Sequence, residues 1–146
     1  MLVDAEMDHG PVLAQEKWAM PSGFDAVMAE DELSRIGADL LARTIPDYSE
    51  GKVTPQPQDH AAATFTKKFT REDGKLDWSR PAVEIYNRIR ALSANPGTWT
   101  VVNGKTLNIL SAHLADGKMI PDRVQLEGGK PMDWESFLRG HSDTVL

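Results

Sequence analysis

Cysteine is absent from the 146-residue sequence, so neither a disulfide framework nor a thiolate metal site is available. The absence is compatible with a reducing cytoplasm, and we expect a cytoplasmic protein. No stretch reaches the roughly 18 apolar residues of a membrane-spanning helix. The N-terminus has neither the basic region nor the apolar run of a signal peptide. The sequence therefore predicts a soluble protein without a membrane partner.

General signatures of enzymes are also missing. The four histidines, at positions 9, 60, 113 and 141, are too scattered to form a local metal-binding pair, so we expect no metal. The sequence contains no glycine-rich phosphate loop and no nucleophile elbow. These absences argue against a metalloenzyme, a nucleotide-binding loop of the common kinds and a serine hydrolase.

Negative charge predominates, with a formal net charge of −6, but it is unevenly distributed. Residues 1–64 contain 4 Lys and Arg against 12 Asp and Glu, whereas residues 65–146 contain 12 against 10. Such a division is typical of two modules with different electrostatic roles. An acidic surface helix followed by an ordinary domain would produce it as well.

The first module contains one clear helix. Apolar residues from Ala26 to Ile45 mostly follow helical spacing, and Pro46 and Gly51 are expected to end this helix. Before it, the pattern predicts two short strands, at residues 2–3 and 11–15, joined by a polar loop. Residues 51–64 have two prolines and little material for a core, so we interpret them as an extended linker.

The second module combines short strands with two helices. Ser79 and Pro81 are typical of a helix start, and the spacing that follows predicts a helix over 81–92. Four strands are expected, at residues 98–102, 105–112, 119–120 and 124–126, with hairpin turns at Asn103-Gly104 and Asp116-Gly117. Asp133 can cap a last helix that runs to Arg139. Strands of this length joined by tight turns predict a small barrel or sheet.

Three carboxylates, of Asp4, Glu6 and Asp8, lie in a loop directly before an apolar run. A carboxylate on such a loop can face a cleft, orient a histidine and pass protons through water. Local chemistry by itself favours a simpler interpretation, in which Asp8 and Gly10 form an Asx-type turn.

Basic residues cluster at Lys67, Lys68 and Arg71 and again at Arg88 and Arg90. They could contact RNA phosphates in a salt-dependent way. A solvated face or structural ion pairs would explain the same clusters. The tryptophans at 78 and 99 lie beside turn residues, so we expect them to pack at corners and not to stack on bases.

Taken in order, several motifs resemble those of one family. Residues 4–15, DAEMDHGPVLAQ, look like the D-x-G-x-D-x-G-P segment of formyltransferases that use 10-formyltetrahydrofolate. Residues 58–68 are similar to the linker of methionyl-tRNA formyltransferases, and residues 72–82 followed by 89–92 to the start of their C-terminal domain. Residues 104–110 match that domain's early strands. Nearly the whole chain resembles the C-terminal half of a methionyl-tRNA formyltransferase.

This resemblance implies an α/β fragment, the end of a Rossmann-like catalytic domain, in residues 1–50. A linker at 51–64 and a mostly-β, OB-like barrel domain with flanking helices at 65–146 would follow. Asp8 aligns with a catalytic Asp that supports a catalytic His. The backbone of Asp4, Ala5, Glu6 and Met7 would line the folate pocket, and Lys67, Lys68, Arg88 and Arg90 would contact the partner, initiator methionyl-tRNA. The full-length protein is expected to be a monomer.

Departures from the family pattern limit what the chain should do. No Asn-x-His sequence occurs, so the catalytic Asn and His have no counterpart, and Glu6 replaces a usual Gly. We therefore expect an incomplete, inactive formyltransferase in which Met1 is an internal methionine. Two other hypotheses stay open: a stand-alone RNA-binding or interaction module, and a formyltransferase acting on an amino-sugar nucleotide.

Overall fold

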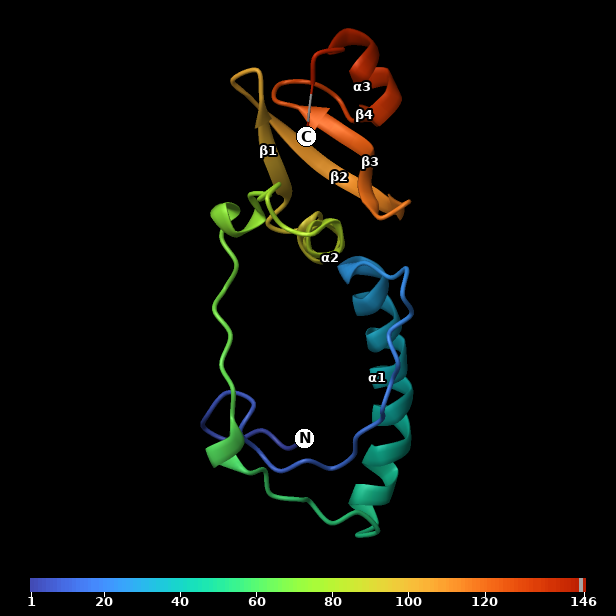
Figure 1. Ribbon diagram of the computed structural model, residues 1–146. Coiled ribbons are helices and arrows are strands. Elements are labelled where there is room, and N and C mark those ends of the chain that lie inside the picture. The colour runs from blue at the N-terminus through green and yellow to red at the C-terminus, as the bar shows by residue number, and fades with distance from the viewer. Residues whose placement is uncertain (145) are drawn as a thin grey trace. The chain divides into compact units, whose positions relative to one another are not determined.

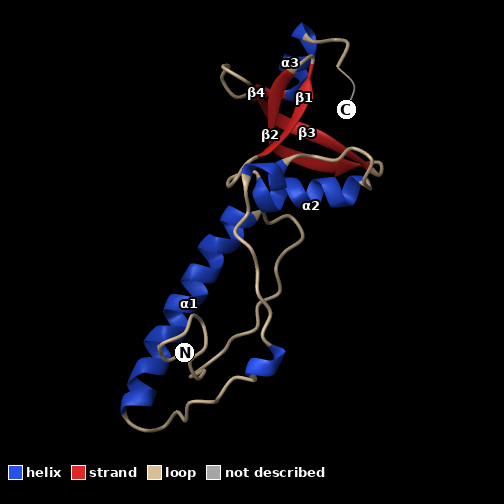
Figure 2. Cartoon of the chain, turned by 90° about the vertical axis from the view of Figure 1, so that its left-hand side faces the viewer, coloured by secondary structure: helices blue, strands red, loops and turns tan. Residues whose placement is uncertain are grey.

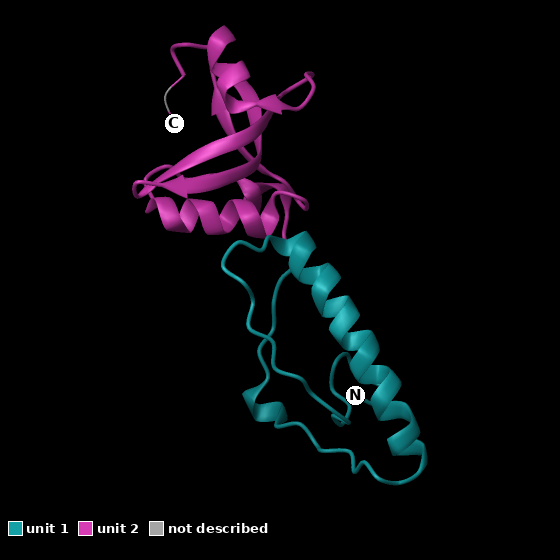
Figure 3. Cartoon of the chain, turned by 90° about the vertical axis from the view of Figure 1, so that its right-hand side faces the viewer, with its two compact units in different colours: residues 1–67 teal, residues 68–146 magenta. Residues whose placement is uncertain are grey.

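The chain divides into two compact units, residues 1–67 and residues 68–146 (Figure 3). We describe a computed structural model that covers residues 1–144 and residue 146. The boundary between the units lies three residues beyond the start of the domain expected at residue 65. Each unit is described below by itself.

Unit 1 contains one long helix, α1, Ala26–Ser49. The carboxylate of Asp25 accepts a hydrogen bond from the Met28 backbone N–H at 2.9 Å, which caps the first turn. The apolar side chains of this helix are about half exposed, as in Leu33, Leu41 and Ile45, and Thr44 is its one buried residue. Within the described part of unit 1, α1 therefore contributes no hydrophobic core.

The expected helix end at Pro46 is wrong by one turn. Pro46 lies inside α1, and the helix continues through Ser49 because the Pro46 carbonyl still accepts from the Glu50 N–H at 3.0 Å. A proline removes only its own N–H donor and clashes mainly with the preceding turn. A proline close to the C-terminal end of a helix therefore still allows the last turn to form after it.

The two strands expected near the N-terminus do not form. Leu2 donates to the Pro11 carbonyl at 2.9 Å, and Val12 makes an isolated antiparallel bridge with Gln56, with both N–H···O distances at 2.8 Å. A strand requires partners along its length, and the described residues of unit 1 supply only these single contacts. The linker residue Gln56 thus pairs with the segment where a strand was expected.

Unit 2 is built on an open antiparallel sheet of four strands in the order β1-β2-β3-β4 (Figures 1 and 2). The strands are β1, Thr98–Val102, β2, Lys105–Ala115, β3, Lys118–Leu126, and β4, Met132–Asp133. Helix α2, Ala82–Leu92, packs against β2 and β3, and α3, Trp134–Gly140, packs on β3 and β4. Among the described residues β1 does not pair with β4, so the sheet does not close into the expected barrel.

Both predicted hairpin turns are present. Asn103 and Gly104 have φ values of 49° and 75°, and Asp116 and Gly117 have 49° and 73°. Two consecutive positive φ angles are the signature of a type I′ turn, which matches the twist of the strands it joins. The positions of these dipeptides in the sequence therefore correctly predicted the hairpin of β1 and β2 and the hairpin of β2 and β3.

One strand replaces the two predicted around Pro121. Strand β3 runs through this proline because Pro121 lies opposite Ala112 of β2, while β4 pairs only with Arg123 and Val124. The strand thus has one neighbour at the proline, where a missing N–H donor is tolerated. The pairing of β2 with β3 has two register shifts beside this proline, between Ile109 and Ser111 and between Ser111 and Ala112.

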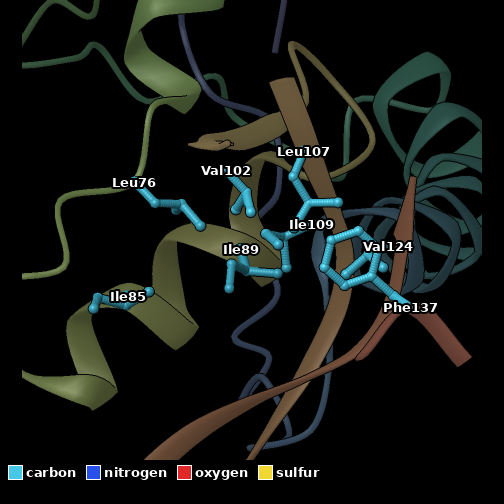
Figure 4. Packing of buried hydrophobic residues seen from close by; sticks show 8 residues of the cluster. All are labelled: Leu76, Ile85, Ile89, Val102, Leu107, Ile109, Val124 and Phe137. Carbon is cyan, nitrogen blue, oxygen red and sulfur yellow. The ribbon is translucent and has the colours of Figure 1, made fainter. Parts of the chain in front are cut away.

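The core of unit 2 forms between α2, the sheet and α3 (Figure 4). Leu107, Ile109 and Val124 are fully buried on one face of β2 and β3, and Ile89 from α2 and Phe137 from α3 are each 1% exposed. Asp133 is the N-cap residue of α3, as predicted, but its side chain makes no capping hydrogen bond. The burial of Phe137 fixes α3 instead.

Candidate functional site

The acidic loop of unit 1 folds around Asp4. One carboxylate oxygen of Asp4 accepts from the Glu6 backbone N–H at 3.0 Å, and the other lies 2.7 Å from Nδ1 of His9. The Asx-type turn that was considered for Asp8 is therefore made by Asp4. The ring of His9 also stacks on that of His60, with centroids 3.7 Å apart and planes 10° apart.

The contact between Asp4 and His9 shifts both pKa values. The hydrogen bond from His9, followed by that from the Glu6 N–H, lowers the pKa of Asp4. The hydrogen bond to Asp4, assisted by the negative charges of Asp4 and Glu6, raises the pKa of His9. Opposite charge and hydrogen bonding favour the charged form of each partner. The pair is thus a carboxylate and imidazolium over the interval between these two pKa values.

Asp8 has an exposed side chain and a left-handed backbone, with φ of 54°. The Nε2 of Gln58 lies 2.8 Å from the Asp8 carbonyl and 2.8 Å from the Gly10 carbonyl. The left-handed conformation is less favourable than extended backbone for a residue with a Cβ, although Asp adopts it more readily than most, so contacts that hold it are informative. Gln58, which the sequence analysis did not single out, supplies such contacts.

Gly10 is buried where two backbone segments meet. A Cβ atom at this position would lie 2.0 Å from the Leu2 carbonyl oxygen. This separation is far below van der Waals contact, so no other residue fits without movement of the backbone. The requirement explains why the D-x-G spacing of the motif ends in glycine. The other predicted pocket residues, Ala5, Glu6 and Met7, are exposed.

The predicted basic residues, of which Lys67 is the last residue of unit 1 and the others belong to unit 2, differ in their contacts. Nη1 of Arg88 donates to the Asp73 carbonyl, which holds helix α2 to the short 3₁₀ helix Arg71–Gly74. Nε of Arg90 donates to Asn87 at 3.0 Å, and its guanidinium lies 5.7 Å from the centre of the Tyr86 ring. Lys67 and Lys68 are exposed and lie where the two units join along the chain.

Arg71 and Trp99 form a corner that the sequence did not reveal. The Arg71 guanidinium donates to the Pro96 carbonyl at 3.3 Å and to Oδ1 of Asn108 at 2.5 Å. It also lies 5.6 Å from the Trp99 ring centre, while Nε1 of Trp99 donates to the Arg71 carbonyl at 2.9 Å. Trp78 similarly donates to Thr100 at 2.8 Å. Both tryptophans are packing residues, as expected.

An open cavity of about 530 Å³ lies between α2 and the segment that precedes it. Its wall mixes one exposed aromatic ring, three carboxylates, three cations and apolar side chains. Arg88 is the one predicted RNA-contact residue in the wall. The residues that line the cavity are Phe69, Asp73, Lys75, Leu76, Asp77, Arg80, Glu84, Ile85, Asn87, Arg88, Ala91 and Leu92.

Two further features bear on the class of protein. In the part of the chain that the structure describes, no three His, Cys, Asp or Glu side chains are grouped in a way that could hold a metal ion. Among the same residues, none of the helices has the length and apolar character needed to cross a membrane. His113 and His141 instead contact Asp122 at 2.6 Å and the Phe137 ring.

Several known proteins are similar in sequence to this chain. Residues 68–121 match the formyl transferase C-terminal domain. The methionyl-tRNA formyltransferase of Chloroflexus aurantiacus is 45% identical over 126 residues, which cover 85% of this chain and 41% of that protein. That of Roseiflexus castenholzii is 36% identical over 164 residues, which cover 96% of this chain and 52% of that protein.

A solved structure, methionyl-tRNA formyltransferase from Clostridium thermocellum, superposes with a TM-score of 0.62 at 20% identity. The superposed residues make up 85% of this chain and 52% of the Clostridium thermocellum chain. At this identity the superposition shows a shared fold. The chain thus spans about half the length of the relatives it matches. The resemblance read from the motifs is confirmed: over most of its length the chain is similar to methionyl-tRNA formyltransferases, and residues 68–121 match the formyl transferase C-terminal domain.

Proposed function

We propose that this chain is part of a methionyl-tRNA formyltransferase, a cytoplasmic monomer that formylates the amino group of initiator methionyl-tRNA. The formyl donor is 10-formyltetrahydrofolate. The observation that supports the proposal most strongly is the match to methionyl-tRNA formyltransferases over 96% of the chain, because it includes both units. Relatives with that name recur at 33% to 47% identity.

In this reaction the methionine amine attacks the formyl carbon, and negative charge develops on the formyl oxygen. The bond between that carbon and the folate nitrogen then breaks, the amine loses a proton, and the tetrahydrofolate that leaves takes up a proton. Fixed donors that face this oxygen supply the largest electrostatic stabilisation in acyl transfer. In the family pattern an Asn and a His provide them, and an Asp supports the His. We assign the Asp role to Asp8, whose exposed carboxylate extends from a loop that Gly10 and Gln58 hold in place. The backbone of residues 4–7 borders the folate.

For unit 2 we propose an OB-like tRNA-binding domain with an open sheet. Lys67, Lys68, Arg88 and Arg90 would neutralise phosphates of the acceptor tRNA, each contributing to a salt-dependent affinity. Lys68 is the most informative of these, since it is exposed and lies directly at the start of the matched domain. Arg88 also holds α2, so its replacement would affect the fold as well as RNA binding.

The test supplies the catalytic Asn-x-His sequence, which does not occur in the 146 residues. The part of the Chloroflexus aurantiacus enzyme that precedes its match would be joined to this chain, and formylation of methionyl-tRNA would be measured. We expect the chimera to be active and the 146-residue chain to be inactive. Asp8→Asn should lower kcat by about 10²- to 10⁴-fold, the usual range for loss of a proton-transfer group.

Asp31→Asn, at an exposed position of α1, is the matched control and should leave kcat unchanged. Formylation by the 146-residue chain alone would contradict the proposal, as would a folded chimera without activity. Full activity of Asp8→Asn would remove the role assigned to Asp8. An amino-sugar nucleotide offered in place of the tRNA should not be formylated, and neither it nor a stand-alone RNA module is favoured by any observation.

A further inference from the structure

The side chain of Gln58, in the linker of unit 1, hydrogen-bonds to the backbone of the acidic loop. Its Nε2 lies 2.8 Å from the Asp8 carbonyl and 2.8 Å from the Gly10 carbonyl. A primary amide has two N–H donors, and here each has its own carbonyl acceptor. Since both neighbours are acceptors, the amide nitrogen and not the amide oxygen must face the loop.

Neighbouring contacts fix the backbone on both sides of Gln58. Two residues before it, Gln56 exchanges two backbone hydrogen bonds of 2.8 Å with Val12. Directly after it, the Asp59 carboxylate accepts from the Ala61 N–H at 3.1 Å and begins the 3₁₀ helix His60–Ala62. The His60 ring then stacks on that of His9. Gln58 is therefore held between two anchored points and reaches the loop from a defined position.

The two acceptors flank the residue whose geometry matters most. Asp8 has a φ of 54°, a left-handed conformation that Asp adopts more readily than most residues with a Cβ but that costs more than an extended backbone. Gly10 is pressed against the Leu2 carbonyl and cannot move in that direction. By bonding the carbonyls of residues 8 and 10, the Gln58 amide opposes relaxation of Asp8 to an extended backbone. Such relaxation would point the carboxylate elsewhere.

We propose that Gln58 is a positioning residue for Asp8, and that the linker therefore takes part in the active site as well as joining the two units along the chain. The assignment of a catalytic effect rests on the proposed function, because it requires Asp8 to act in formyl transfer. The contact between the linker and the loop is independent of the proposed function. The two parts are therefore tested separately.

The first test uses the 146-residue chain and follows the Asp8 backbone by NMR. Gln58→Glu keeps the size of the side chain but replaces both donors by acceptors near neutral pH. We expect the three-bond HN–Hα coupling and ¹³C shifts of Asp8 to lose their left-handed values. The matched control is Gln56→Glu, two residues away, whose side chain donates only to the Thr54 carbonyl. It should leave Asp8 unchanged.

An unchanged Asp8 backbone in folded Gln58→Glu would overturn the proposal, and so would an equal change in Gln56→Glu. Circular dichroism of α1 identifies a variant that has unfolded. If Gln58→Glu unfolds, Gln58→Met, which keeps the length of the side chain without a donor, decides the question by the same Asp8 signals.

The second test measures kinetics in the chimera described above. Loss of two neutral hydrogen bonds lowers the population of the ordered loop by about tenfold or more, so kcat of Gln58→Glu should fall about tenfold. KM for methionyl-tRNA should not change, since no contact to the proposed RNA-binding residues is lost. In the double variant with Asp8→Asn, the Gln58 substitution should add no further loss, because Gln58 acts through Asp8.

Additive losses would refute a role through Asp8. If Asp8→Asn alone is fully active, the proposed function of Asp8 fails. The NMR comparison of the two glutamine variants still decides whether Gln58 holds the loop.

Discussion

Replacement of Arg71 by alanine should destabilise unit 2, although Arg71 is exposed and belongs to a basic cluster that suggests RNA binding. The guanidinium donates to Asn108 on β2 and to the Pro96 carbonyl, and it lies over the Trp99 ring at 5.6 Å. Hydrogen bonds from a charged donor contribute roughly 1.5–3 kcal/mol, and an exposed cation–π contact about 0.5–1 kcal/mol. Solvent screening reduces the sum.

We therefore expect a loss of about 2 kcal/mol in the free energy of unfolding of unit 2. For a domain of 60–100 residues this corresponds to a decrease in Tm of about 8–16 °C. Thermal unfolding can be followed by the fluorescence of the tryptophans in unit 2, of which Trp78 and Trp134 pack against its core. Lys68→Ala removes the same charge from an exposed side chain and serves as the control.

An RNA-binding titration should separate the two variants, because one is expected to lose stability and the other RNA affinity. Below its Tm, Arg71→Ala should keep most of its affinity for methionyl-tRNA. Lys68→Ala should be as stable as the parent, bind more weakly and reduce the slope of log affinity against log salt by about 1. If Arg71→Ala melts within 2 °C of the parent, the contacts at the Trp99 corner do not stabilise the domain and the reasoning is refuted.

Three further substitutions test other parts of the structure. Gly74→Ala would place a Cβ 1.8 Å from the Gly97 carbonyl, so unit 2 should lose roughly 1–3 kcal/mol or more in urea unfolding; a parental midpoint would contradict this packing. Ile109→Ala, at a fully buried position, should cost about 2–5 kcal/mol in the same assay. Asp4→Asn should lower the pKa of His9 in an NMR titration, because Asp4 is the main cause of its rise; no change would mean that the contact does not form in solution.

The direction of these pKa shifts sets the pH range over which the acidic loop is most stable. The raised pKa of His9 gives a stabilisation that is complete below its unfolded value of 6.5 and is lost as the pH rises through the folded pKa. The lowered pKa of Asp4 gives a stabilisation that is present above its unfolded pKa of 3.8 and is lost as the pH falls through the folded pKa. The contact should therefore be strongest between about 3.8 and 6.5.

Local rules predicted unit 2 well because each of its elements carries its own signal. Asn103-Gly104 and Asp116-Gly117 determine the turns through their backbone preferences. Helical spacing located α2 to within one residue, but Pro81, expected in the first turn, is the N-cap residue in place of Ser79. Continuation of β3 through Pro121 was not predictable, because it depends on which neighbouring strand lies beside the proline.

Unit 1 was harder to predict because its contacts connect segments far apart in sequence. An apolar run at residues 11–15 looks like a strand, but whether it pairs depends on partners that the run does not specify. The resemblance to a family identified Asp8, whereas no local signal distinguished Gln58 from the neighbouring Gln56. Only the positions of the Asp8 and Gly10 carbonyls separate these two residues.

The open sheet of unit 2 has a consequence for self-association. A sheet that does not close has two edges, and long exposed edges invite pairing with another molecule. Here the outer edge of β1 is partly occupied, because the Leu76 N–H donates to the Trp99 carbonyl at 2.9 Å and Lys75 bridges to Trp99. On the other side β4 has two residues and follows directly on Pro131. These two segments of the sheet edges are thus poor templates for strand addition.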